Sequence, residues 1–338
     1  MTALAVLSPG FPSSPGGVTD HTHRLVGHWA GAGHAVRVVA DLGVEPETLA
    51  AELAESRVRG LLIQYVPFLY GRRGLSSYPE RLAGSARTRG IQVILFVHEP
   101  WVPMTRLPWL VLGPLQRRQL RRLIRVADRV VTAVPAWRVT LGPRTELLYV
   151  GSNLGAVPSD IPSTQLAGPV VFSPTAAGLR FDWIVAAARA IGASPGLVLV
   201  GIDAAEARRH PQLAGWIDPT WDWRGRLAAP EALRVIARAQ LVLTPFVDGA
   251  TGRRTSMLAA VSSGARVLSS TGPLLDPLFR ESPVLLANSK SEFVDLAVRT
   301  WHAPDSPGAR DARLAWYRAH LDPGLLDAKL LSLMTEKP

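Results

Sequence analysis

The chain has 338 residues, no cysteine, 47% hydrophobic and 19% charged residues, and a formal net charge of +10. This length allows two ordinary domains with a core each, and the composition excludes a disordered chain. The lack of cysteine excludes disulfide bonds and thiolate metal sites. Positive charge suits nucleotide sugars, anionic lipid surfaces and nucleic acid equally, so charge alone selects none of them.

The N-terminal stretch MTALAVLSPGF lacks the basic region of a secretory signal, and no apolar run is long enough to span a bilayer. We therefore expect a cytoplasmic protein that is soluble or peripheral at the inner membrane face.

The first half alternates strand and helix patterns. Leu4 to Leu7 reads as a buried strand, followed by a Pro/Gly loop that contains Gly16 and Gly17, a helix from near Thr19, and the strand AVRVVA. This order opens a doubly wound α/β domain, in which ligands bind at the loops that follow the carboxyl ends of the strands.

Polar and aromatic side chains follow the next two strands. Gln64 and Tyr65 end the strand in LLIQYVPFLYG, and His98, Glu99 and Trp101 follow the strand in RGIQVILFVHEPW. A lone histidine after a strand is often structural. For His98, a structural role and a role in binding both remain open at this point. We do not expect His21 and His23 to form a metal site with Asp20, because residues two apart on a helix do not share a face.

An apolar stretch from Trp101 to Leu115 reads as a loop and leads into a basic amphipathic helix. Arg118, Arg121, Arg122 and Arg125 recur at helical spacing, with leucine and isoleucine on the other side. Such a surface can dock on an anionic bilayer or hold a lipid-linked acceptor. A surface helix that packs its leucines on its own domain explains the same spacing.

The second half repeats the alternation of strands and helices. The Ser/Pro/Gly-rich residues 151–168 read as a linker, and strands follow in PVVF, LVLVGID, WRGRL and LVLTPF. A further helix is expected from Pro323 to Met334.

The densest chemistry lies in Leu241 to Gly272, LVLTPFVDGATGRRTSMLAAVSSGARVLSSTG. The pattern predicts a strand, a loop, a helix over Thr255 to Ser263 that stops at Gly264, and a second strand. Asp248, Arg253 and Arg254 lie where the loop meets the helix N-terminus, an arrangement that can bind a diphosphate. The alternative is a solvated basic loop.

The segment PFVDGATGRRTSMLAAVSSGARVL resembles the donor-binding segment of retaining GT-B glycosyltransferases of the family 4 type. The GG loop after the first strand, the G-H-x-V pattern of GHAVRVV, the Q-Y strand end and the V-G-S-N turn are similar as well. The resemblance implies an α/β fold with two Rossmann-like domains facing a central cleft. Residues 1–150 would bind the acceptor, residues 169–320 would bind the nucleotide sugar, and residues 321–338 would form a terminal helix packing back on the first domain.

The resemblance also implies roles for individual residues. Asp248 and His98 are the expected catalytic residues, which orient the sugar. The expected donor-binding residues are Gly16, Gly17, Arg180, Gly201, Arg226, Leu227, Gly249, Arg253, Arg254 and Thr255. The expected acceptor-binding residues are His21, Gln64, Tyr65, Glu99 and Trp101.

The chain departs from the family pattern at two places. Ala259 stands where the family has a second acid that binds the ribose, and Pro174 and Leu179 stand where it has a basic diphosphate clamp. Either Arg180 restores the clamp, or Arg253 and Arg254 replace it.

The implied function is transfer of a sugar from a nucleotide-diphosphate donor to a glycan, lipid-linked or small-molecule acceptor. The resemblance implies retention of configuration and neither a metal nor another cofactor. The alternative is a noncatalytic carbohydrate- or partner-binding protein, which the missing acid and clamp favour. Nucleic-acid binding rests on charge only and is not expected.

Overall fold

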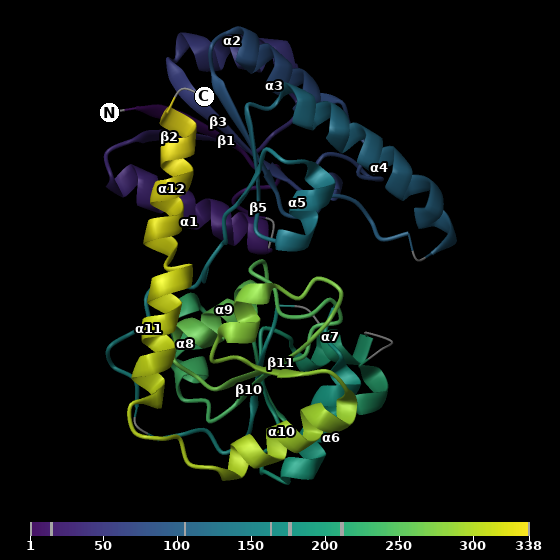
Figure 1. The fold of residues 1–338 in the computed structure, drawn as a ribbon, viewed down its shortest axis with the longest axis vertical. Helices are drawn as coiled ribbons and strands as arrows, with labels where there is room; N and C mark the ends of the chain where they lie inside the picture. The colour runs from purple at the N-terminus through teal and green to yellow at the C-terminus, as the bar shows by residue number, and fades with distance from the viewer. Residues whose placement is uncertain are drawn as a thin grey trace. The chain divides into compact units, whose positions relative to one another are not determined.

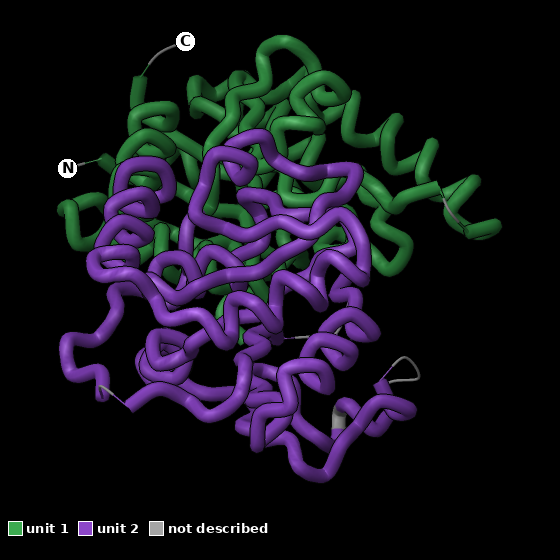
Figure 2. Tube along the Cα trace, turned by 60° about the horizontal axis from the view of Figure 1, so that its bottom comes forward, with its two compact units in different colours: residues 1–150, 323–338 green, residues 151–322 purple. Residues whose placement is uncertain are grey.

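A computed structural model describes residues 2–13, 16–104, 106–162, 164–174, 178–209 and 213–336. The chain divides into two compact units, shown in Figure 2: unit 1 comprises Met1–Val150 with Pro323–Pro338, and unit 2 comprises Gly151–Asp322. Each unit contains a parallel six-stranded sheet with helices around it. The predicted α/β class with two Rossmann-like domains is therefore confirmed.

The sheet of unit 1 has the strand order β2-β1-β3-β4-β5-β6. Its strands are β1 Ala3–Leu7, β2 Ala35–Val39, β3 Val58–Tyr65, β4 Gln92–Val97, β5 Arg129–Thr132 and β6 Thr145–Leu147. Its helices are α1 Gly17–Gly31, α2 Pro46–Glu55, the short 3₁₀ helix η1 Pro67–Leu69, α3 Tyr78–Thr88, α4 Leu107–Val126, α5 Pro135–Leu141 and α12 Pro323–Thr335. Figure 1 shows the arrangement of these elements and labels most of them.

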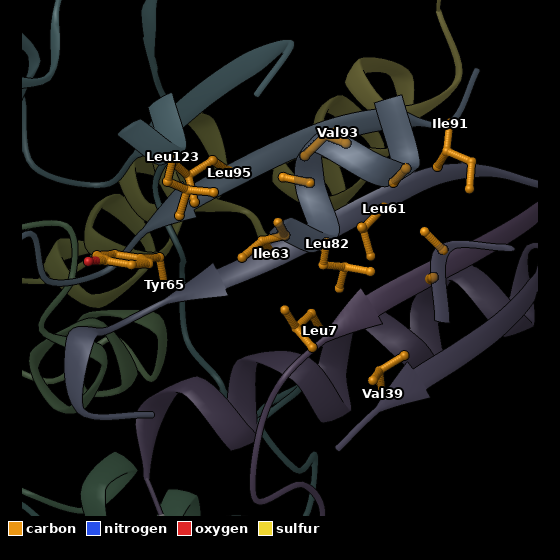
Figure 3. Packing of buried hydrophobic residues seen from close by; sticks show 14 of the residues in the cluster. Leu7, Val39, Leu61, Ile63, Tyr65, Leu82, Ile91, Val93, Leu95 and Leu123 are labelled. Carbon is orange, nitrogen blue, oxygen red and sulfur yellow. The ribbon is translucent and has the colours of Figure 1, made fainter. Parts of the chain in front are cut away.

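Apolar side chains cover both faces of the central strands, because helices pack on each side. Figure 3 shows one face, where side chains of β1, β3 and β4 pack with Leu82 of α3 and Leu123 of α4. The alternate residues of the same strands face α1 and α12, where Trp29 and Leu330 are buried. The near-continuous apolar runs of β3 and β4 follow from this burial on both faces.

Helix α12 belongs to unit 1 although all of unit 2 precedes it in the sequence. It packs against α1, β3 and β4. Arg24 of α1 forms an ion pair with Asp327 of α12 at 2.7 Å, and both side chains are almost fully buried. The same guanidinium donates to the carbonyls of Val150 and Pro323, so it joins three segments of the unit.

The sheet of unit 2 has the strand order β12-β11-β10-β7-β8-β9. Its strands are β7 Val170–Phe172, β8 Val198–Val200, β9 Asp222–Gly225, β10 Val242–Thr244, β11 Val267–Ser270 and β12 Leu285–Ala287. Its helices are α6 Phe181–Ile191, α7 Ala204–Arg209, η2 Ala214–Trp216, α8 Ala229–Ala237, α9 Thr255–Ser262, η3 Pro277–Glu281, α10 Lys290–His302 and α11 Ala309–Leu321. The predicted helix before Gly264 is α9, and Gly264 ends it with a φ of 73°.

The predicted apolar loop from Trp101 to Leu115 is wrong over its second half, because α4 already begins at Leu107. Pro108 occupies the first turn, where a missing N–H costs no hydrogen bond. Pro114 lies inside the helix. Prolines are typical of loops, so Pro108 and Pro114 favoured the prediction of a loop over this stretch.

No helix within the described residues is long and apolar enough to cross a membrane.

Replacing Asp327 with alanine leaves the buried Arg24 guanidinium without its carboxylate. We expect this change to lower the free energy of unfolding by about 3 kcal/mol, measured by urea denaturation. The control is Glu52→Ala, which breaks the exposed Arg37–Glu52 pair of the same unit and should cost less than about 1 kcal/mol. Equal losses in the two variants would contradict a role for Asp327 in holding α12.

Candidate functional site

The strand order of unit 2 reverses direction between β7 and β10, which lie side by side. Loops that follow adjacent strands at such a switch point leave in opposite directions, and the crevice between them is the usual ligand site of a doubly wound sheet. The loop after β7 ends at Arg180, and the loop after β10 carries Asp248, Arg253 and Arg254. The predicted donor residues with the strongest charge therefore lie around this switch point.

The loop after β10 is fixed by close backbone packing. Gly249 has a φ of 93°, and a Cβ on Gly272 would lie 2.4 Å from the carbonyl carbon of Asp248. The Leu274 amide donates to the Asp248 carbonyl at 2.9 Å, and the Ala250 amide donates to the Ser270 carbonyl at 3.1 Å. Only glycine fits at position 272, so the backbone of Asp248 is held in place.

Asp248 binds both arginines. One carboxylate oxygen accepts from Arg253 at 2.5 Å, and the other accepts from Arg254. The side chains are only 15% (Asp248), 20% (Arg253) and 19% (Arg254) exposed, so the alternative of a solvated basic loop is wrong. Burial raises the pKa of Asp248, but the two guanidinium groups outweigh it and hold this pKa below its usual value. The carboxylate is ionised, and the three groups together carry one net positive charge.

The loop after β7 runs beside the loop after β10. The Val247 amide donates to the Gly178 carbonyl at 2.8 Å, and the Arg180 amide donates to the Pro245 carbonyl at 2.7 Å. A Cβ on Gly178 would lie 3.3 Å from Nη2 of Arg254, so this guanidinium packs directly on the glycine. Arg254 also stacks over the ring of Phe246 at 4.4 Å. Arg180 lies over Trp183 at 4.6 Å, which gives a third guanidinium beside the same pair of loops.

Helix α9 begins at Thr255 directly after the two arginines, and the side chain of its N-cap residue Arg254 makes no cap hydrogen bond. Its first-turn N–H groups and the arginines are therefore on adjoining residues, a combination that favours anions. Ala259, at the position of the missing second acid, is fully buried in the helix packing.

The remaining predicted donor residues of unit 2 lie after β8 and β9. Gly201 has a φ of 98°, and a Cβ there would lie 2.3 Å from the Ser173 carbonyl oxygen, so glycine is required where β7 and β8 end. Arg226 is exposed and Leu227 is half-buried directly after β9. The structure gives neither of them a contact with Asp248 or the arginines.

In unit 1, Gly16 precedes α1 as its N-cap residue with a φ of 154°, and Gly17 is the first residue of the helix. Among the described residues, and apart from its two chain neighbours, nothing lies within 4 Å of the position that a Cβ on Gly16 would take. The preceding residues 14 and 15 lie outside the described residues.

Three predicted residues of unit 1 form a chain of contacts at the carboxyl edge of β3 and β4. Nε2 of His98 lies 2.5 Å from Oε1 of Gln64, and Nε2 of Gln64 lies 3.4 Å from Nδ1 of His21. Oε1 of Gln64 can only accept, so Nε2 of His98 carries the proton. Nε2 of Gln64 can only donate, so Nδ1 of His21 accepts. Gln64 therefore joins the two histidines and fixes the tautomer of each.

His21 is buried against Phe96 and His98, with ring centroids 5.3 Å and 5.4 Å away. Burial lowers the pKa of His21 well below its usual value, and Arg24 and His98 lower it further. A neutral imidazole agrees with an Nδ1 that accepts a hydrogen bond. Gln64 and His21 thus contact His98 and not the solvent, whereas both were expected to bind an acceptor directly.

The structure does not bring Tyr65 to this group. Its ring lies in the core between the sheet and α4, as Figure 3 shows, and its hydroxyl accepts from Nε2 of Gln119 at 3.3 Å. Burial raises the pKa of Tyr65 to about 12. Because alternate side chains of a strand point to opposite faces, the side chains of Gln64 and Tyr65 lie on opposite faces of the sheet. Glu99 is exposed, and Trp101 stacks against Arg117 of α4 at 5.3 Å.

Sequence reasoning missed Thr22 and Ser8, which extend the contacts of Gln64. Nε2 of Gln64 lies 3.4 Å from Oγ1 of Thr22, which lies 3.1 Å from Oγ of Ser8. Their positions in the sequence could have indicated them, since Ser8 directly follows β1 and Thr22 directly follows His21 on α1. Within the described residues, no three histidine or acidic side chains are grouped so that they could hold a metal ion.

No protein-family model matches the sequence, and no curated protein matches it. Solved structures do match. AviGT4, a glycosyltransferase involved in avilamycin A biosynthesis, has a TM-score of 0.63 and 16% identity, over 99% of this chain and 97% of that one. The α,α-trehalose 6-phosphate synthase of Burkholderia multivorans has a TM-score of 0.60 and 13% identity, over 99% of this chain and 98% of that one.

The pneumococcal O-GlcNAc transferase GtfA, solved with UDP and GlcNAc, has a TM-score of 0.59 and 12% identity. That match covers 84% of this chain and 59% of the transferase. Identities this low establish a shared fold and leave activity to the site itself. The chain has the GT-B glycosyltransferase fold, as its sequence predicted.

The lowered pKa of His21 makes stability depend on pH. Below pH 6.5 the histidine binds a proton in the unfolded chain and stays neutral in the folded one, so the free energy of unfolding falls as pH drops below 6.5 and is fully retained above it. We expect His21→Asn to flatten this dependence, measured as melting temperature against pH. Exposed His23 provides the control, and His23→Asn should follow the parent curve. Parallel curves for His21→Asn and the parent would contradict a neutral buried imidazole.

Proposed function

We propose that the chain is a glycosyltransferase that takes a sugar from a nucleotide-diphosphate donor. The observation that carries this proposal is the Asp248 carboxylate with Arg253 and Arg254 at the switch point of unit 2, directly before the N-terminus of α9. Guanidinium groups and helix amides suit a diphosphate, and they offset the charge that develops on it as the leaving group.

The roles within this site follow from its charges. Arg253 and Arg254 bind the diphosphate, and Arg180 on the neighbouring loop can add a third cation in place of the missing clamp. Asp248 orients both guanidinium groups in the free protein and is our candidate for contact with the sugar hydroxyls. In unit 1, His98 is our candidate for contact with the transferred sugar, and Gln64 holds it in one tautomer.

Two finer statements rest on the resemblance of the donor segment. We propose retention of the anomeric configuration by same-face substitution. A proton NMR time course tests this proposal, because it identifies the anomer of the product that forms first. We also propose transfer without a metal, because arginines supply the positive charge at the diphosphate. Activity that disappears in EDTA and returns with a divalent cation would contradict the second statement.

Binding of the diphosphate is tested with UDP, GDP, ADP and dTDP by calorimetry. Arg253→Ala and Arg254→Ala should each weaken the best of these ligands about 10- to 100-fold, because a hydrogen bond to a charged group contributes about 1.5–3 kcal/mol. The matched control is Arg234→Ala, which removes an arginine paired with Asp160 on the surface of the same unit. The proposal fails if the three variants bind the nucleotide equally well.

Asp248→Asn separates binding from transfer. It removes the negative charge that offsets the two arginines but keeps one side-chain oxygen that can accept from a guanidinium group, so the nucleoside diphosphate should still bind. Hydrolysis or transfer of the matching nucleotide sugar should fall about 100-fold, as for a lost interaction of about 3 kcal/mol with the reacting sugar. A parent that binds nucleotides but turns over no nucleotide sugar would favour the noncatalytic alternative.

A further inference from the structure

Helix α4 exposes an unusual number of large apolar side chains. Leu107 is 83% exposed and Val111 is 68% exposed, and Leu110 and Leu115 are exposed as well. These four residues lie on one side of the first half of the helix, at the spacing of successive turns. Scattered exposed leucines need no explanation, but a contiguous apolar strip usually marks a contact surface.

The same side of the helix is strongly basic in its second half. Positions 118, 122 and 125 continue the line through Leu107 and Val111, and all three are exposed arginines, with Arg121 beside them. The whole helix contains five arginines and no acidic residue. We call the exposed residues Leu107, Leu110, Val111, Leu115, Arg118, Arg121, Arg122 and Arg125 the α4 outer face.

The opposite side of α4 is already occupied by its own domain. Leu120 and Leu123 are buried in the core of unit 1, and Gln116 is buried with its amide bonded to the Val102 amide and the Arg73 carbonyl. The α4 outer face is therefore not needed for the packing of the domain. Figure 1 shows that the first turns of α4 project beyond the helices beside it in unit 1.

A shallow groove adjoins the α4 outer face where its apolar and basic halves meet. It has a volume of about 300 Å³ and is lined by Leu75, Leu115, Arg118, Arg122, Glu80 and Ser76, among others. Two guanidinium groups and one carboxylate lie beside two leucines, so the groove carries a net positive charge and suits a ligand with an anionic head and an apolar tail.

We propose that the α4 outer face binds the surface of an anionic lipid bilayer. The leucines and Val111 enter the boundary between headgroups and acyl chains, and the arginines contact anionic headgroups. Charge complementarity favours a bilayer over a second copy of the protein, because α4 carries no acidic side chain that could pair with the arginines of another α4. The contact is independent of the donor loop, so it holds whether or not unit 2 transfers a sugar.

The test is flotation of the full chain with phosphatidylcholine vesicles, with and without phosphatidylglycerol. The parent should bind only the vesicles that contain phosphatidylglycerol, and less at high salt. Arg118→Gln with Arg122→Gln should lower the partition coefficient roughly 30-fold, as expected for two arginines near a charged surface. The charge-matched control is Arg59→Gln with Arg89→Gln, two exposed arginines elsewhere in unit 1.

The apolar half is tested with Leu107→Ser and Val111→Ser together, and Val139→Ser on α5 serves as an exposed apolar control. The double variant should lose binding at least tenfold, while Val139→Ser binds as the parent does; circular dichroism verifies that each variant is folded. Binding that ignores lipid charge, or equal binding by the outer-face and control variants, would overturn the proposal. If the parent forms a dimer and binds no vesicles, and the double variant Leu107→Ser with Val111→Ser is monomeric, the face mediates self-association instead.

Discussion

In each sheet the strand order reverses beside the first strand. The positions of the Asp248 group in unit 2 and of the Gln64 group in unit 1 both depend on this reversal. In unit 2 the reversal lies between β7 and β10, and in unit 1 it lies between β1 and β3. Parallel strands deliver all their following loops to one edge, and the reversal separates two neighbouring loops there. Asp248 and Arg254 follow one such strand, and Gln64 ends another. The charged and polar side chains of each unit are therefore concentrated at the edge where doubly wound sheets usually bind ligands.

The carboxylate of Asp248 also affects how the arginines of the loop after β10 are held. Two neighbouring guanidinium groups repel each other, and a carboxylate that accepts from both removes most of this cost in the free protein. The arginines are consequently held in one geometry before an anion arrives, which reduces the ordering cost of binding. Gly272 and Gly249 contribute by allowing the backbone contacts that fix the position of Asp248. The site thus combines a net positive charge with preorganisation.

The sequence predicted the fold class because its strands are short apolar runs that end in glycine, proline or polar loops. It also predicted helix α9 and its stop at Gly264, which depend on local patterns. It did not predict that α4 starts at Leu107, because prolines such as Pro108 and Pro114 are typical of loops, whereas here one lies in the first turn of the helix and the other inside it. It predicted that Tyr65 and Gln64 both bind the acceptor, although the side chains of adjacent strand residues point to opposite faces of a sheet. The contacts of Gln64 with Thr22 and of Thr22 with Ser8 join residues far apart in the chain, which local patterns cannot connect.

The pairing of Arg24 with Asp327 makes unit 1 discontinuous in the sequence. During synthesis, a ribosome completes the whole of unit 2 before it releases the helix that covers one face of the unit 1 sheet. Until then Leu62, Ile94 and Phe96 lack part of their cover, and nascent unit 1 exposes an apolar surface to chaperones and to other chains. Premature termination after unit 2 would consequently damage the first unit and leave the second one whole.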